Sequence, residues 1–121
     1  MFHAEVDPAN NLLKFSFSKR VTRDDTVRWK NELPALLQKL KPGFKLLSNF
    51  SDVESIDVAC APDIEAVMDL CNKAGIVKVV RVITNPRQDI GLSIMSLFHY
   101  RRCISIVTAE TSEEGLAALA E

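Results

Sequence analysis

The first regular pattern in the chain is an alternation of apolar and polar residues. In Leu12–Ser18 leucine or phenylalanine recurs at every second position with polar residues between, which is typical of a strand with one buried face. Phe2–Asp7 is another extended run, and Pro8–Asn11 between the two has the composition of a turn. The chain is therefore predicted to open with an antiparallel hairpin.

The stretch from Phe44 to Ile83 carries the clearest succession of elements. Phe44–Asn49 is predicted to be an apolar-rich strand, Phe50–Asp57 an acidic turn, and Ile76–Ile83 a second, β-branched strand. Between them lies a helix that ends at Gly75. Its apolar face comprises Ile64, Val67, Met68, Cys71 and Ala74. A strand, a helix and a further strand form the parallel crossover unit.

A helix is also predicted before this unit. Thr22, followed three residues later by Asp25, has the pattern of a helix start. Pro34 removes a backbone donor, so a kink or short break is expected there, with the helix resuming through Lys41. The predicted inner face comprises Val27, Leu33, Leu36, Leu37 and Leu40.

Two further helices and a strand are predicted after the unit. Asp89 caps a helix at Ile90–Tyr100 that is apolar nearly all round, so it is either deeply buried or presents an apolar side to another molecule. Arg102–Val107 is predicted to be the last strand, and Thr111 with Glu114 forms a capping box for a short final helix.

These elements predict one α/β domain over residues 1–121. A single, mostly parallel sheet would carry the N-terminal antiparallel hairpin, and right-handed crossovers between neighbouring strands place the crossover helices mainly on one face. The other face would be partly solvated or covered by a partner. Polar strand positions agree with that arrangement, namely Lys14, Ser16, Ser18, Ser48 and Ser105.

Composition excludes several classes of protein. The formal charge of −1 and the pI near 6.1 give no long-range field for nucleic acid. No apolar run approaches the roughly 20 residues of an integral membrane segment, and the first residues lack the features of a secretory signal. Cys60, Cys71 and Cys103 are interpreted as reduced thiols, which predicts a cytoplasmic protein.

The order of elements resembles that of the STAS domain, the fold shared by bacterial anti-sigma-factor antagonists and the cytoplasmic tails of sulfate transporters. The specific part of the resemblance is the run LLSNFSDVESIDVACAPDIEAVM leading to GIVKVVRVI. In that family an aspartate, two small hydroxyl residues and a glycine precede a helix, and the second hydroxyl is phosphorylated in partner-switching members. Here Asp57 matches the aspartate, Val58 and Ala59 the hydroxyl residues, and Cys60 the glycine. The resemblance therefore implies a divergent scaffold without the usual phosphoserine switch.

Other chemistry is weakly supported by the residues. Asp57 is interpreted as a helix cap, and Cys60 as buried filler, with a reactive thiol at a helix start as the alternative. Ser51 and Ser55 are interpreted as solvated turn residues that could replace the missing phosphorylation site. His99 and Cys103 have no partners that complete a metal site. No nucleophile elbow or phosphate-binding loop is present, so no enzyme, cofactor or metal is predicted.

The sequence thus favours a non-enzymatic regulatory module that binds a protein partner or forms a homodimer. The candidate partner surface comprises Ser55, Asp57, Val58, Ala59, Cys60, Asp63, Arg87 and Met95. It joins the acidic turn to the predicted helix Ile90–Tyr100. Each of these follows a parallel strand, so both are expected at the carboxyl end of the sheet. The alternative is a small carrier for an apolar ligand or lipid, with a cavity beneath Ile90, Ile94, Leu97 and Phe98.

Overall fold

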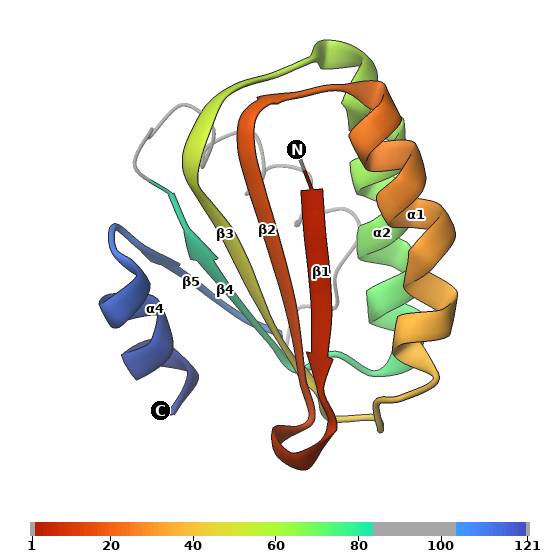
Figure 1. Ribbon diagram of the computed structural model, residues 1–121. Coiled ribbons are helices and arrows are strands. Elements are labelled where there is room, and N and C mark those ends of the chain that lie inside the picture. Colours follow the sequence, from red (N-terminus) through yellow and green to blue (C-terminus); the bar gives the residue numbers. More distant parts are fainter. Residues whose placement is uncertain (1, 84–103, 121) are drawn as a thin grey trace.

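A computed structural model describes residues 2–83 and 104–120 of the chain. Its five strands form one sheet in the order β1-β2-β3-β4-β5 (Figure 1). The first pair is antiparallel and the other three are parallel. The strands are β1 (Phe2–Asp7), β2 (Leu12–Val21), β3 (Lys45–Ile56), β4 (Lys78–Val82) and β5 (Ser105–Ala109). The predicted α/β class, with its N-terminal hairpin and mostly parallel sheet, is confirmed.

Helices cover the two faces of the sheet unequally. The helices α1 (Arg23–Leu37) and α2 (Ala61–Ala74) lie side by side on one face, and the shorter α4 (Ser112–Leu119) lies on the other (Figure 1). The crossover helices in the described part of the chain, α1 and α2, thus share a face, as predicted. The opposite face is covered in part by the chain itself, because α4 packs there on Val80.

The first helix differs from its prediction in its end and in its buried face. Thr22 N donates to Asp25 Oδ2 at 3.0 Å, as the start pattern implied. The helix continues through Pro34, because proline removes only one backbone donor and its own carbonyl still accepts from Gln38 N at 3.2 Å. The helix ends three residues later, at Leu37. The predicted resumption through Lys41 is therefore wrong.

Trp29 lies at the centre of the buried face of α1, although the predicted inner face did not include this residue. Its ring lies 4.8 Å from that of Phe15 and 5.0 Å from that of Phe17, both in edge-on geometry. Leu33 is buried beside it, whereas Val27 is only partly buried. The side of α1 that carries Trp29 is buried because Trp29 packs on the aromatic side chains of β2. Edge-on aromatic pairs add stability beyond the area they bury.

The predicted acidic turn at Phe50–Asp57 is wrong, because β3 runs on to Ile56. The register of β3 with β2 extends to the pair Val21↔Ile56, with two shifts along the way. Phe50 and Val53 are buried within the acidic stretch, and the Phe50 ring stacks on that of Phe17 at 5.2 Å. Backbone pairing and these apolar contacts outweigh the turn-like composition.

Strand alternation places two polar residues on the core face. Ser48 follows Leu46 on β3, and Arg81 follows Val79 on β4, so both share the face that α1 and α2 cover. They are only 4% and 2% exposed. The assignment of Ser48 to the polar face is therefore wrong, whereas Lys14 and Ser16 lie opposite the buried phenylalanines of β2 as predicted.

The last helix is held at both ends. Thr111 Oγ1 accepts from Glu114 N at 3.2 Å, which confirms half of the predicted capping box, while the Glu114 carboxylate accepts from Glu110 N instead. At the other end, Lys45 Nζ donates to Leu119 O at 2.6 Å, and Lys78 Nζ donates to Ala118 O. Two ammonium groups thus bind carbonyls at the negative end of the helix.

Gly115 sets how closely α4 approaches the sheet. A Cβ atom at this position would lie 2.8 Å from Val82 Cγ2. We expect Gly115→Ala to lower the free energy of unfolding by about 1–2 kcal/mol, because overpacking outweighs a gain of about 1 kcal/mol in helix propensity. Urea denaturation measures this change. The penalty should shrink in a Val82→Ala background, and a net stabilisation by Gly115→Ala would contradict the close packing.

Candidate functional site

The candidate site lies where β2 and β3 run into their helices. β2 ends at Val21 and leads into α1, while β3 ends at Ile56 and leads through a short 3-10 turn, η2 (Val58–Cys60), into α2. Asp57 N donates to Val21 O at 3.0 Å, which joins the two strand ends. This is the carboxyl end of the parallel strands, where open α/β sheets usually bind ligands.

The turn η2 is fixed from below by polar contacts. The Asp57 carboxylate accepts from Arg20 Nε at 2.8 Å, and this hydrogen bond raises the pKa of the Arg20 guanidinium. Asp57 occupies the capping position of η2, but its side chain makes no capping hydrogen bond. The cap interpretation therefore holds for position only. Cys60 N donates to Asp57 O at 2.9 Å and closes the turn.

A buried carboxylate connects the two helices below the turn. The Asp63 side chain is only 4% exposed. Its oxygens accept from Thr26 Oγ1 at 3.0 Å and lie 3.1 Å from Lys30 Nζ, with Arg23 Nε at 3.9 Å. Asp63 thus lies inside the protein and positions the start of α2 against α1. We call Asp63, Thr26 and Lys30 the helix clamp.

The predicted surface residues of this end differ in exposure. Val58 is 92% exposed, and Ser55 and Ala59 are also exposed. Cys60 is fully buried. Ser55, Asp57, Val58 and Ala59 therefore form one surface around η2, which we call the turn surface. Arg87 and Met95, with the rest of the predicted third helix, lie outside the described residues.

Lys19 gives this end a strained backbone. Its φ of +59° is in the left-handed region, which costs about 1–2 kcal/mol for a residue other than glycine. The pairing of β2 with β3 shifts register between Lys19 and Arg20. Such irregularities redirect side chains near functional sites. Here the shift precedes Arg20, whose guanidinium binds Asp57. Sequence reasoning missed Arg20, Thr26 and Lys30, because none of them belongs to a motif.

Reactive and metal chemistry have little support at this end. Cys60 Sγ lies 3.6 Å from Val21 O, and burial raises the pKa of its thiol, so little thiolate forms at neutral pH. Burial raises the pKa of the Cys71 thiol to about 12. Within residues 2–83 and 104–120, no three histidine, cysteine or acidic side chains are arranged to hold a metal ion. His99 and Cys103 are outside these ranges.

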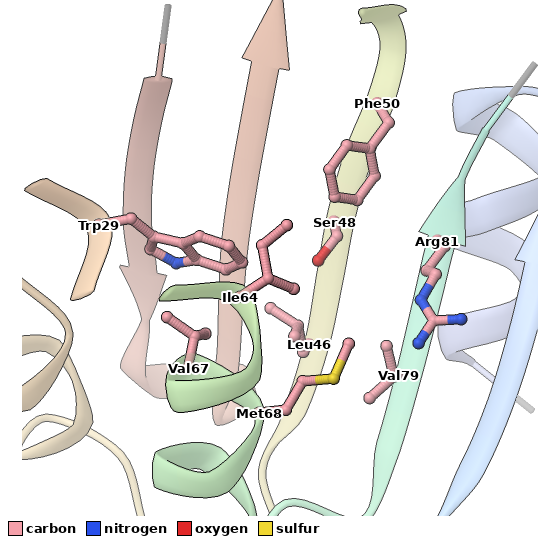
Figure 2. A pocket seen from close by; sticks show the side chains of 9 residues that line it. All are labelled: Trp29, Leu46, Ser48, Phe50, Ile64, Val67, Met68, Val79 and Arg81. Carbon is pink, nitrogen blue, oxygen red and sulfur yellow. The ribbon is translucent and has the colours of Figure 1, made fainter. Parts of the chain in front are cut away.

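A pocket lies between α2 and the sheet, away from the turn surface (Figure 2). This pocket measures about 320 Å³ when its solvent-open part is included. Trp29 Nε1, on its wall, is buried and has no hydrogen-bond partner among the described residues. The other lining residues are Leu46, Ser48, Phe50, Ile64, Val67, Met68, Val79 and Arg81. The predicted cavity beneath Ile90, Ile94, Leu97 and Phe98 falls outside the described residues.

Solved structures share this arrangement over almost the entire chain. An uncharacterised protein with a SpoIIAA-like fold from Shewanella loihica matches with a TM-score of 0.71 at 14% identity, covering 98% of this chain and 93% of that one. The unphosphorylated anti-sigma factor antagonist SpoIIAA matches with a TM-score of 0.69 at 10% identity, covering 99% and 97%. The chain has a STAS-like fold. The fold implied by the sequence resemblance is thereby confirmed.

An anti-sigma factor antagonist from Mycobacterium paratuberculosis has the same STAS-like fold. It matches with a TM-score of 0.62 at 16% identity and covers 100% of this chain and 96% of that one. No family model and no curated protein matches the sequence. None of the helices in the described part of this STAS-like chain is both long and apolar enough to cross a bilayer.

The helix clamp can be tested on α1. Lys30→Met should lower the free energy of unfolding by about 1–3 kcal/mol, because it leaves the buried Asp63 carboxylate short of a charged partner. Glu32→Gln is the control: it removes a solvent-exposed ion pair with Arg28 and should change stability by less than about 1 kcal/mol. Urea denaturation compares the two. The cost of Lys30→Met should decrease in an Asp63→Asn background, and equal costs in both backgrounds would contradict the clamp.

The thiol of Cys60 provides a separate test. In the folded protein it should react with a thiol reagent at pH 7 more slowly than in the urea-unfolded chain, because it is buried and its pKa is raised. Its rate should rise with pH as thiolate forms. Timed labelling followed by peptide mapping measures each cysteine separately. Labelling of Cys60 that is faster than in the unfolded chain would restore a redox or catalytic role.

Proposed function

We propose that the chain is a non-enzymatic regulatory module that binds a protein partner through the turn surface. The observation that carries this proposal is the exposure of Val58. A valine side chain that is 92% exposed adds almost no buried apolar area to the folded monomer. Val58 lies on a turn whose position is fixed by the Arg20–Asp57 ion pair and by the helix clamp. Apolar side chains on a rigid support suit contact with a protein, because little conformational entropy is lost on binding.

The partner suggested by the solved neighbours is an anti-sigma factor, since SpoIIAA and the mycobacterial protein are described as antagonists of such factors. We propose that this chain binds without the usual phosphoserine switch, because Val58 and Ala59 have no hydroxyl group. Ser51 already bonds through its hydroxyl to Asn49 Oδ1 at 2.6 Å. Ser55 is exposed and remains the candidate for a relocated switch.

The absence of enzymatic activity and a cytoplasmic location belong to the same proposal. The turn surface offers a carboxylate bound to arginine, and Cys60 beneath it is a buried thiol of raised pKa; neither group is poised as a base or nucleophile. Cys60 and Cys71 are both free thiols in the fold, which agrees with a reducing compartment.

Photocrosslinking tests the turn surface. A benzoylphenylalanine placed at Val58 should capture one discrete protein in lysate of the source organism, and excess wild-type chain should suppress the product. Leu116 is the matched control, because it is also an exposed apolar residue, 54% exposed, but lies on α4. Val58→Asp should leave the melting temperature nearly unchanged and abolish capture from a probe at Ala59. Equal capture from Leu116, or capture that survives Val58→Asp, would contradict the proposal.

A second function is favoured by the pocket between α2 and the sheet. Its apolar lining with a few buried polar groups is typical of small-molecule sites. We propose that the module can also carry a small apolar ligand there. This pocket is separate from the turn surface, since none of the turn-surface residues lines it.

A further inference from the structure

The polar groups of the pocket are mostly hydrogen-bond donors. Arg81 contributes a guanidinium, which only donates, and Trp29 contributes an indole N–H, which also only donates. Ser48 can donate or accept. Among the nine described lining residues, no side chain carries a carboxylate or an amide oxygen. A molecule that complements this pocket must therefore supply acceptors.

Two of these donors lie far apart within the pocket. Figure 2 shows Trp29 and Arg81 on opposite sides, with Ser48 and Leu46 between them. Trp29 is 5% exposed, and within residues 2–83 and 104–120 its Nε1 has no hydrogen-bond partner. A buried polar group without a partner is rare in folded proteins and calls for an acceptor. Arg81 already takes part in an interaction within the protein, but its five N–H groups can serve more than one acceptor.

The remainder of the wall is apolar and includes a flexible side chain. Leu46, Val67 and Val79 come from strands and helix on either side, and Met68 projects between the donors (Figure 2). The enclosed space holds about one water molecule, so a larger ligand must enter from the open side and displace a side chain. Met68 suits that movement, because methionine is unbranched and adapts to irregular space.

We propose that this pocket binds a small carboxylic acid with an apolar middle and a second oxygen acceptor at its far end. The carboxylate accepts from Arg81 and Ser48, and the second acceptor, a carbonyl or hydroxyl oxygen, accepts from Trp29 Nε1. A carboxylate matches a guanidinium better than a neutral oxygen does, because charge-assisted pairs are shorter and stronger. The identity of the ligand rests on the carrier function proposed above and is independent of the turn surface.

Titration with straight-chain oxo acids whose ketone is on the penultimate carbon tests the proposal. The series runs from 4-oxopentanoate to 7-oxooctanoate, so that its members differ in the distance between the two acceptors. The fluorescence of Trp29, the one tryptophan of the chain, reports binding, and calorimetry gives the dissociation constant. The best oxo acid should bind at least about tenfold more tightly than two analogues of equal carbon number, the simple fatty acid and the methyl ketone.

Variants identify the contacts. Trp29→Phe should abolish the preference over the fatty acid, and Arg81→Gln should abolish the preference over the ketone, both measured by calorimetry. Ser48→Ala, a smaller change, should also weaken binding of the acids and serves if Arg81→Gln melts below the assay temperature. Met68→Phe should block binding by filling the pocket, whereas Leu116→Phe on the exposed side of α4 should not.

The outcomes separate the two levels of the proposal. Equal affinity for the oxo acid and the ketone would overturn the acid specificity while supporting an apolar carrier. Absence of saturable binding by every compound would overturn the carrier as well and leave the pocket as a site for water only. Binding that persists unchanged in Met68→Phe would place the ligand elsewhere and overturn the proposed site.

Discussion

The parallel pairing of β2 with β3 is the contact on which the rest of the structure depends. Because it continues to Val21 and Ile56, both strands end at the same level, and the two crossover helices begin side by side. The helix clamp is possible only in that arrangement, since Asp63 and Thr26 are 37 residues apart in the chain and lie on different helices. The same pairing stacks Phe50 on Phe17 and builds the aromatic wall against which Trp29 packs.

Much of this fold follows from local sequence patterns. Three local patterns each predict one element without reference to the rest of the chain: the alternation around Phe15, the helical spacing around Val67 and the β-branched strand before Ile83. The order of these elements predicts the crossovers. The polar end of β3 could not be recognised in that way. Residues 51–56 have a turn-like composition, and they are extended because β2 supplies hydrogen-bond partners from another part of the chain. Trp29 was missed on α1 for a similar reason, since its burial depends on the rings beneath it.

The contacts that hold the turn surface in place could not be predicted from the sequence. The resemblance around Asp57 pointed to the turn, and Val58 is exposed there. Arg20 and Lys30 carry no local signal, because Arg20 meets Asp57 only when β2 pairs with β3, and Lys30 meets Asp63 only when α1 packs against α2. The pocket between α2 and the sheet was not predicted, although the strand period that buries Leu46 and Val79 also places Ser48 and Arg81 on the core face. Ser48 and Arg81 are therefore buried because of their positions in the alternation of the strands. Polarity alone suggested the wrong face for Ser48.

The order of strands in the sheet has a consequence for folding. It follows the order of the chain, so each strand adds beside the one before it and none must be inserted between two others. Contacts then form over the shortest separations that parallel pairing allows, which favours rapid folding. Synthesis from the N-terminus would extend the sheet in one direction, away from β1. Of the described elements, α4 is the last to emerge, and it packs on Val80 on the second face. Until then the growing chain exposes Val80 and the apolar residues around it, and exposed apolar strand surface favours aggregation.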